Sequence, residues 1–114
     1  MLDLADIQAD HQVLEPSCGM GSIVDSLYEQ LPELDVTAIE MNRTLKPVLD
    51  AKGYAVYFGD FLEHQGEYDR IVMNPPFERG ENSDIDHMRH AYTLLKPGGK
   101  LVSVMGEGAF SRSD

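Results

Sequence analysis

The sequence predicts a single α/β domain built on a mostly parallel five-stranded sheet. Short apolar runs alternate along the chain with segments whose apolar residues recur at helical spacing. The first run ends in Glu15 and Pro16, and the small-residue turn 17–22 and a helix follow it. Strand, glycine turn and helix in this order are typical of the opening unit of a nucleotide-binding fold. Because crossovers between such units are right-handed, the strands should run parallel.

Each element has its own local signal. Apolar runs that stop at proline, glycine or an acid predict strands at 12–16, 36–40, 54–58, 69–73 and 100–105. Apolar residues at helical spacing predict helices at 1–10, 23–31, 45–52, 61–65 and 84–95. The tail 106–114 is rich in glycine and serine and is expected to be loose.

Pro47 constrains where the third of these helices begins. With Thr44 as the N-cap, Pro47 takes the third helical position, where no intrahelical N–H bond is lost. A cap at Asn42 would place the proline too deep in the helix. We therefore expect Thr44 to be the cap and Gly53 to end the helix.

Length and composition describe one ordinary globular domain, residues 1–114. Hydrophobic residues make up 42% of the chain and charged residues 25%. No apolar run approaches the ~20 residues that a membrane span needs. Asp3 and Asp6 stand where a signal peptide would have a basic region and an apolar core. A cytoplasmic location without membrane association is expected.

The single cysteine, Cys18, excludes an internal disulfide and a multi-cysteine zinc site. It is expected to be a small packing residue. His87 and His90 lie three residues apart on a predicted helix near Asp84 and Asp86, but no ligand spacing completes a metal site. We predict no metal, and we expect both histidines to be exposed at the mouth of the ligand site.

The charge balance separates this chain from ordinary nucleic-acid-binding domains. Nine Lys and Arg stand against twenty acids, and the formal net charge is -11. Phosphate contacts normally require a basic face. If the substrate is DNA or RNA, regions outside this chain are therefore expected to grip it.

The fourth predicted strand stops abruptly at Asn-Pro-Pro-Phe. Pro75 and Pro76 cannot donate ladder hydrogen bonds, so the strand must end before them. The Asn74 amide, the Pro75 carbonyl and the Phe77 ring then stand at the carboxyl end of the strand, where open α/β sheets bind ligands. The two oxygens can accept the N–H groups of a planar amine and aim its lone pair, while Phe77 can stack on a base. The same pattern also fits a plain Pro-Pro turn with Phe77 in the core.

Taken together, these segments resemble the class I S-adenosylmethionine-dependent amino-methyltransferases, especially the adenine-specific DNA methyltransferases. The matching pieces are Val13–Gly21, Glu40, Gly59-Asp60-Phe61, Asn74-Pro75-Pro76-Phe77 and Leu95–Gly99. The resemblance covers nearly the whole chain. It implies a Rossmann-like core with strand order 3-2-1-4-5 and S-adenosyl-L-methionine as the cofactor.

The resemblance also implies which residues contact the cofactor. Gly19 and Gly21 would let the backbone approach its methionine part, and Glu15 would orient its ammonium group. Glu40, 19 residues beyond Gly21, would meet the ribose hydroxyls, and Met41 would pack on the adenine ring. The implied set is Glu15, Pro16, Cys18, Gly19, Gly21, Glu40, Met41, Asp60, Phe61 and Asn74.

Catalysis is assigned by the same resemblance to Asn74, Pro75, Pro76 and Phe77. Asn74 and Pro75 would hold the target amine, and Phe77 would stack on the target base. The transfer would be an in-line displacement at the methyl group, with positioning supplying most of the acceleration. Adenine in DNA is the expected substrate.

Several alternatives remain open at this point. Asn-Pro-Pro-Phe also fits base amines in ribosomal RNA, and Glu40 and Asp60 can be ordinary solvated acids at strand ends. A nicotinamide-binding fingerprint would have glycine or alanine where Val24 stands. A truncated module that binds the cofactor or a partner without turnover is a further alternative.

The family fold has seven strands, and its last two form an antiparallel edge that the sequence does not predict here. The chain is therefore expected to be the cofactor-binding core of a larger protein. Strand 100–105 would be left as an unprotected edge, which invites pairing with another chain. We accordingly expect a homodimer or strand addition at that edge.

Overall fold

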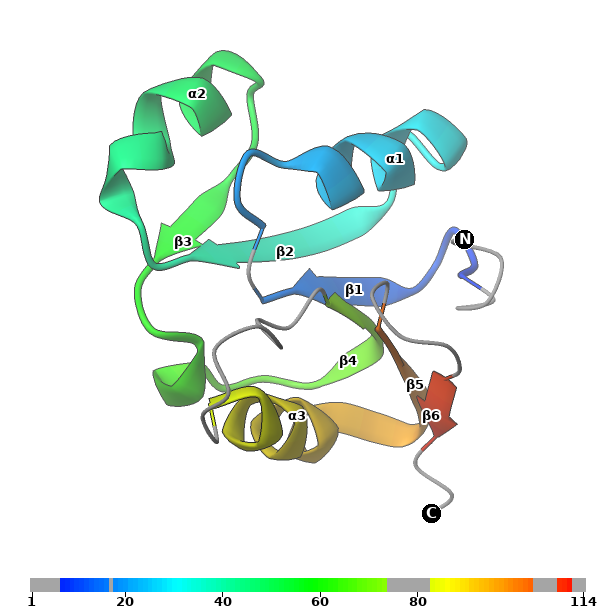
Figure 1. Ribbon diagram of the computed structural model, residues 1–114. Coiled ribbons are helices and arrows are strands. Elements are labelled where there is room, and N and C mark those ends of the chain that lie inside the picture. Colours follow the sequence, from blue (N-terminus) through cyan, green and yellow to red (C-terminus); the bar gives the residue numbers. More distant parts are fainter. Residues whose placement is uncertain (1–6, 17, 74–82, 104–108, 112–114) are drawn as a thin grey trace.

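A computed structural model describes residues 7–16, 18–73, 83–103 and 109–111. Its centre is a six-stranded sheet in the order β3-β2-β1-β4-β5-β6 (Figure 1). The strands are β1 (Gln12–Glu15), β2 (Asp35–Glu40), β3 (Val56–Phe58), β4 (Tyr68–Met73), β5 (Leu95–Ser103) and β6 (Ala109–Ser111). The first five pair in parallel and β6 is antiparallel to β5. The predicted order 3-2-1-4-5 is confirmed.

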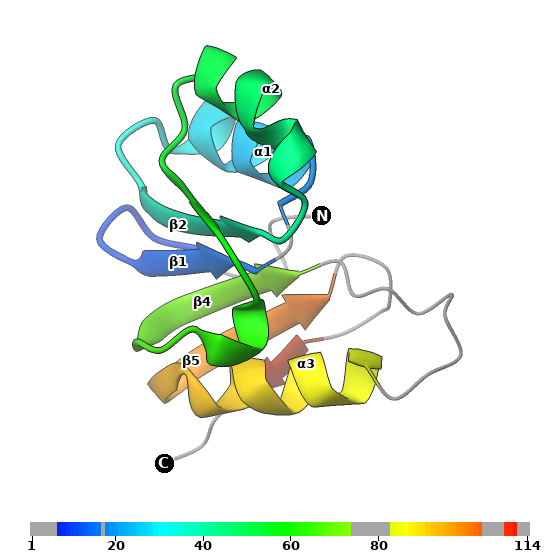
Figure 2. The ribbon, with the colours of Figure 1, turned by 90° about the vertical axis from the view of Figure 1, so that its left-hand side faces the viewer.

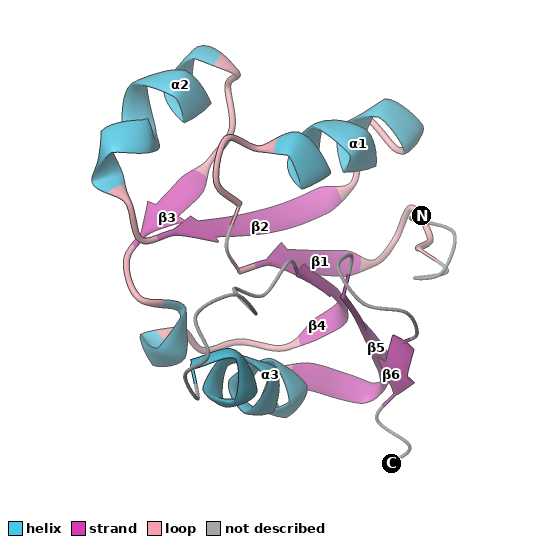
Figure 3. Cartoon of the chain, viewed as in Figure 1, coloured by secondary structure: helices cyan, strands magenta, loops and turns pink. Residues whose placement is uncertain are grey.

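Helices cover both faces of the sheet. Figure 2 shows α1 and α2 on one face and α3 on the other. The helices are α1 (Ser22–Gln30), α2 (Lys46–Ala51) and α3 (Ser83–Thr93), with single 3-10 turns η2 (Arg43–Leu45) and η3 (Phe61–Glu63). Figure 3 shows the loops, in pink, that join the helices to the ends of the strands.

Burial on both faces explains why the central strands read as continuous apolar runs. Val13 and Leu14 are neighbours on β1, and both have no exposed surface. Val13 packs with Leu27 of α1, whereas Leu14 belongs to a separate cluster with Ala91 of α3. Successive side chains of a strand point to opposite faces, so one run fills two cores.

Two predictions near the chain ends are wrong within the described residues. Residues 7–10 form a turn, with the His11 N–H bonded to the Gln8 carbonyl at 3.0 Å, and not the end of a helix. The rest of that predicted helix, residues 1–6, lies outside the described part. The tail 106–114 was expected to be loose, but residues 109–111 form β6.

β6 also changes the prediction for the edge of the sheet. It pairs with Lys100, Leu101 and Val102 of β5, so this stretch of β5 is covered by the chain's own tail. The prediction that strand 5 is an unprotected edge is therefore wrong for this stretch, and the homodimer predicted to form through that edge loses its structural argument. An antiparallel strand at this place is what the resembled family has, although only one of its two is seen in the described residues.

The cap of the third predicted helix also differs from expectation. Thr44 is not the cap: Asn42 caps the turn η2, where its Oδ1 accepts from the Thr44 N–H at 3.1 Å, and Leu45, the residue before α2, makes no side-chain cap bond. The turn η2 follows before α2 begins at Lys46, so Pro47 still lies in the first α-helical turn. A 3-10 turn absorbs the residues that would otherwise have placed Pro47 too deep. Gly53, with φ of 80°, ends the helix as predicted.

Gly99 sits where β4 and β5 change register, and we expect Gly99→Ala to be strongly destabilising. An added Cβ would lie 2.9 Å from the Lys96 carbonyl oxygen and 3.1 Å from those of Tyr68 and Asp69. These are backbone atoms, so relief requires the strands to separate, at a cost of about 1–3 kcal/mol or more in the free energy of unfolding. Urea unfolding measures this loss in the free energy of unfolding. Gly59→Ala is the control, since its Cβ meets nothing within 4 Å.

Candidate functional site

The predicted site residues follow four neighbouring parallel strands at one edge of the sheet. Glu15 ends β1, Glu40 ends β2, and Asp60 comes two residues after β3. Met73 ends β4, which pairs with β1. The proposed catalytic residues 74–77 come next in the sequence and lie outside the described residues, so their roles stay predictions.

The glycine turn is tied to the end of β2 by two hydrogen bonds. The Cys18 N–H donates to the Ile39 carbonyl at 2.9 Å. The Gly19 N–H donates to Oε1 of Glu40 at 2.8 Å. The turn is closed internally by the Gly21 N–H, which donates to the Cys18 carbonyl at 2.8 Å. Glu40, which the resemblance assigns to the cofactor, is therefore also a structural partner of the turn.

The two glycines of this turn are required for different reasons. Both have positive φ, 56° at Gly19 and 89° at Gly21, which disfavours other residues. A Cβ at Gly19 would meet nothing within 4 Å, so its surroundings are open to a ligand. A Cβ at Gly21 would lie 3.2 Å from the Tyr54 ring and 3.3 Å from Leu49. Gly21 therefore serves close packing of the turn, whereas Gly19 leaves space.

Glu40 keeps the capacity to bind a ligand despite its structural bonds. Its Oε2 accepts from the Asn42 N–H at 2.7 Å, so each carboxylate oxygen takes one backbone N–H. A carboxylate oxygen has two lone pairs, so each oxygen of Glu40 can still accept one hydrogen bond from a ligand hydroxyl. The two backbone bonds fix the direction in which the remaining lone pairs point.

Asp60 and Phe61 occupy different environments. Oδ1 of Asp60 accepts from the Leu62 N–H at 2.9 Å and caps η3, and the side chain is half-buried. A hollow of about 210 Å³ adjoins Asp60 and Tyr57. Phe61 is only 3% exposed and lies in the core between the sheet and α3. Within the described structure its ring is therefore part of the core next to Asp60, and its contact with the cofactor remains a prediction.

Met41 and Met20 give the site exposed apolar surface. Met41, directly after Glu40, is 62% exposed, and Met20 in the glycine turn is 56% exposed. Single exposed apolar side chains are ordinary, but two of them beside the same turn offer apolar surface to a ligand. Both flank the bond between Gly19 and Glu40, so they are suited to packing on a flat ring.

A profile of the methyltransferase small domain matches residues 1–110. The chain belongs to this family. Its relatives include the ribosomal RNA small subunit methyltransferase C of Photorhabdus laumondii, 30% identical over 89% of this chain and 33% of that protein. The type I restriction enzyme MjaVII methylase subunit of Methanocaldococcus jannaschii is 28% identical over 87% of this chain and 21% of that protein. The modification methylase CviBIII of a Chlorella virus is 32% identical over 57% of this chain.

Solved structures share the fold of this methyltransferase domain. TrmN from Thermus thermophilus is 29% identical, with a TM-score of 0.73 over 88% of this chain and 34% of that chain. Coclaurine N-methyltransferase, solved with S-adenosylhomocysteine, has a TM-score of 0.74 at 23% identity, over 88% of this chain and 32% of that one. This chain spans between 19% and 34% of the length of these relatives. The comparisons agree with S-adenosyl-L-methionine as the cofactor predicted from the sequence.

Glu15, before the glycine turn, and Cys18, within it, are buried side chains of the methyltransferase domain. Glu15 has no exposed surface and Cys18 is 7% exposed. Burial, reinforced by the charges of Glu15 and Glu40, raises the pKa of the Cys18 thiol to about 12. The thiolate is therefore disfavoured, which agrees with the packing role predicted for Cys18.

Alkylation of Cys18 should accordingly be slow in the folded domain. At pH 9 a thiol with this pKa is about one-thousandth ionised, whereas an ordinary one is about half ionised. We expect reaction with iodoacetamide at least ~100-fold slower than in 6 M urea, where the thiol regains its ordinary pKa. Mass spectrometry follows the reaction, and equal rates in the two states would contradict the burial.

His87 and His90 are not the exposed polar positions that the sequence predicted. Their rings meet the Phe61 ring edge-on, with centroid distances of 5.7 and 4.9 Å. Nε2 of His90 also lies 2.7 Å from the His64 carbonyl oxygen, so it donates there. Both histidines are half-buried and join α3 to η3. Among the described residues, no group of three or more His, Cys, Asp or Glu is placed to hold a metal ion, and no helix is long and apolar enough to span a membrane.

Sequence reasoning missed the residues that brace the outer side of the glycine turn. Lys52 Nζ lies 2.8 Å from the Met20 carbonyl oxygen and 2.9 Å from Oδ2 of Asp25. Tyr54 donates its hydroxyl to Oδ1 of Asp25. A lysine and a tyrosine after a helix form no recognisable sequence motif. Their contacts with the turn arise only because the fold brings α1 and the end of α2 together.

Proposed function

We propose that this domain binds S-adenosyl-L-methionine at the carboxyl ends of β1, β2 and β3. It transfers a methyl group to an exocyclic amine of a nucleic-acid base, and adenine in DNA is the first candidate for this base. One observation carries the proposal. Glu40 accepts from the Gly19 N–H at 2.8 Å, which joins the glycine turn and the strand-end acid into one site. Both pieces belong to the pattern that the methyltransferase resemblance assigns to the cofactor.

The charges of the site suit a cationic ligand. Glu15, Glu40 and Asp60 stand at three adjacent strand ends. S-adenosyl-L-methionine carries a sulfonium and an ammonium, and when bound it supplies an electrophilic methyl group. Three carboxylates at one edge of the sheet favour positive charge there.

Individual residues of this domain fit parts of the cofactor. Glu40 has lone pairs left for the ribose hydroxyls, and the carboxylate of Asp60 can accept a further N–H from an adenine amine. Met41 offers exposed apolar surface to the ring. The open space beside Gly19 admits the amino-acid part of the ligand. Glu15, fully buried at the end of β1, contributes charge from below the turn.

The acceptor amine is proposed to be held by the segment that follows β4. The Asn74 side-chain oxygen and the Pro75 carbonyl would each accept one N–H, and Phe77 would stack on the base. Holding both hydrogens localises the nitrogen lone pair and directs it at the methyl group. The proton released on transfer leaves through one of these acceptors or water.

Adenine in DNA is the first candidate for the substrate because Asn-Pro-Pro-Phe and its surroundings resemble the adenine-specific DNA methyltransferases. Two relatives are named as a restriction enzyme methylase subunit and a modification methylase. The net charge of -11 means that the grip on DNA is proposed to come from regions outside this chain.

A base amine in ribosomal RNA is the second candidate. The relative that aligns over 89% of this chain is named as a ribosomal RNA methyltransferase, which favours this substrate. The chemistry at the amine is the same, so the two candidates differ in what surrounds the base.

The test measures transfer of labelled methyl from S-adenosyl-L-methionine to duplex DNA and to ribosomal RNA, followed by mass spectrometry of the nucleosides. We expect methylated adenine from DNA. Methylated base from RNA alone selects the second candidate. Because DNA binding is proposed to need regions outside this chain, transfer is assayed at low salt and high nucleic-acid concentration. Saturable cofactor binding without transfer to either nucleic acid under these conditions would reduce the function to that of a cofactor-binding module.

A further inference from the structure

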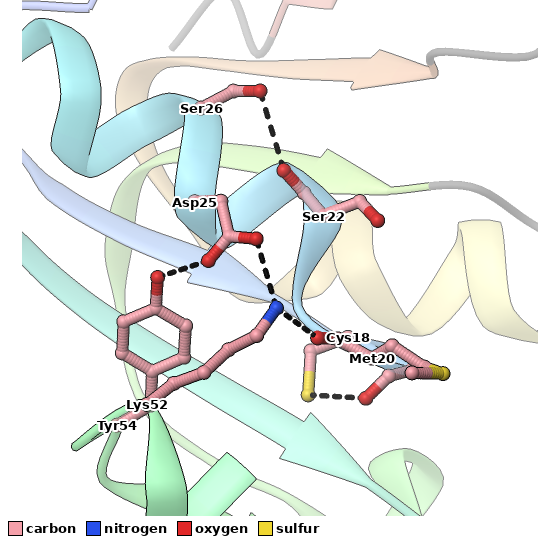
Figure 4. A network of polar contacts seen from close by, with 8 residues as sticks. Cys18, Met20, Ser22, Asp25, Ser26, Lys52 and Tyr54 are labelled. Atoms are coloured by element: carbon pink, nitrogen blue, oxygen red, sulfur yellow. Dashed lines mark hydrogen bonds and ion pairs between the residues drawn. The ribbon is translucent and has the colours of Figure 1, made fainter. Parts of the chain in front are cut away.

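We propose that Lys52, Asp25 and Tyr54 are positioning residues that hold the glycine turn in its cofactor-binding conformation. This inference rests on the proposed cofactor site and assigns a role to side chains that do not themselves touch the ligand. Figure 4 shows the three side chains converging above the turn from α1 and from the segment after α2.

Lys52 makes the direct contact with the turn. Its Nζ donates to the Met20 carbonyl at 2.8 Å and to Oδ2 of Asp25 at 2.9 Å. The carbonyl belongs to the Met20–Gly21 peptide, whose N–H donates to the Cys18 carbonyl at 2.8 Å. A peptide unit is planar, so bonds at both its oxygen and its hydrogen fix its orientation. Without Lys52, only one of the two bonds remains.

Tyr54 adds a steric brace from the same side. Its ring lies 3.2 Å from the position of a Cβ on Gly21, and it packs on the Tyr28 ring at a centroid distance of 5.5 Å. Its hydroxyl donates to Asp25, which also holds Lys52. This bond lowers the pKa of Asp25 and raises that of Tyr54 to about 12, so the donor and acceptor keep their roles across neutral pH. Asp25 thereby links the ring to the ammonium.

The opposite side of the turn is held by β2. The Cys18 N–H bonds to Ile39 and the Gly19 N–H to Glu40. The turn is thus clamped between β2 on one side and the Lys52–Asp25–Tyr54 cluster on the other. A Cβ on Gly19, which lies between the two clamps, would meet nothing within 4 Å, so this part of the turn has room for a ligand.

The effect of the cluster should fall on ligand binding more than on folding. Lys52 and Asp25 are 33% and 41% exposed, and solvated ion pairs contribute little to global stability. Apparent affinity, however, falls in proportion to the fraction of molecules whose site is correctly formed. Loosening the turn therefore weakens binding without unfolding the domain.

The experiment titrates S-adenosyl-L-methionine into the full chain by calorimetry, comparing wild type with Lys52→Met, Lys52→Arg and Tyr54→Phe. We expect Lys52→Met to weaken binding about five- to tenfold, Tyr54→Phe to weaken it less, and Lys52→Arg to restore most of it. Lys46→Met is the matched control: it removes a lysine that is paired with Asp50 at 2.8 Å on α2, away from the turn.

Hydrogen exchange supplies a readout that does not depend on the cofactor. The Gly21 amide should exchange faster in Lys52→Met than in wild type, while the Leu14 amide in the core does not change. The cofactor site stands if wild type binds the cofactor and Glu40→Gln weakens this binding. The positioning role is overturned, with the site still standing, if Lys52→Met then equals Lys46→Met both in its affinity for the cofactor and in the exchange rate of the Gly21 amide. If wild type binds no cofactor, the proposed site fails and the positioning role falls with it.

Discussion

Replacing Glu40 by alanine should weaken the binding of S-adenosyl-L-methionine by about 100-fold or more. Two effects add in the same direction. The proposed bonds to the ribose hydroxyls are lost, and a hydrogen bond to a charged group contributes about 1.5–3 kcal/mol. The Gly19 and Asn42 N–H groups also lose their acceptors, at 2.8 and 2.7 Å. Calorimetric titration measures the affinity, and urea unfolding shows that the variant remains folded.

Glu40→Gln separates the two effects. The amide keeps one acceptor oxygen and nearly the same shape, so the turn retains either the Gly19 or the Asn42 bond, but the charge is gone. We expect a loss of about tenfold, between wild type and alanine. Wild-type affinity in Glu40→Ala would show that Glu40 is a structural acid at a strand end and not a ligand of the cofactor.

The strands of the sheet were predictable because their signals are local, whereas their order 3-2-1-4-5 came from the family resemblance. Parallel strands buried on both faces give uninterrupted apolar runs, such as Ile71–Met73, and each run ends in a residue that cannot continue a strand. The glycine turn and the acids at the ends of β1 and β2 follow the same logic. Their place along the chain therefore put each of them at the carboxyl end of a predicted strand.

Contacts between distant residues were not predictable in the same way. Glu40 and Gly19 are far apart in the sequence, and the family resemblance implied a ligand contact for each, not the bond between them. Phe61 follows Asp60 directly, yet its ring turns into the core against α3, because η3 points successive side chains in different directions. Only packing decides which of two adjacent side chains faces the site.

Short elements were also beyond local pattern. β6 has three residues, fewer than sequence periodicity can register, and it exists because β5 offers an edge with unsatisfied backbone groups. The cap at Asn42 depended on the turn η2, which has no hydrophobic signature. In both places backbone hydrogen bonding, which the sequence does not display, determined the structure.

Asn74→Ala should lower kcat for methyl transfer by about 10²–10³-fold while changing the affinity for S-adenosyl-L-methionine less than about threefold. The proposed role of Asn74 is to accept an N–H of the target amine and to keep its lone pair aimed at the methyl group. That interaction matters most as the nitrogen becomes tetrahedral, so its loss falls on kcat. Asn74 follows β4 in the sequence, and β4 pairs with β1, which leads into the glycine turn, so the proposed acceptor site is expected at the same ends of the strands as the proposed cofactor site.

Asn74→Asp is the matched control for this prediction. It keeps an acceptor oxygen at the same position and changes the charge, so it should retain more activity than alanine. Single-turnover transfer of labelled methyl, measured beside calorimetric binding, separates chemistry from affinity. A parallel loss of affinity and rate in Asn74→Ala would place Asn74 in cofactor binding. Unchanged turnover would show that Asn-Pro-Pro-Phe in this chain is a turn that ends a strand and does not hold the amine.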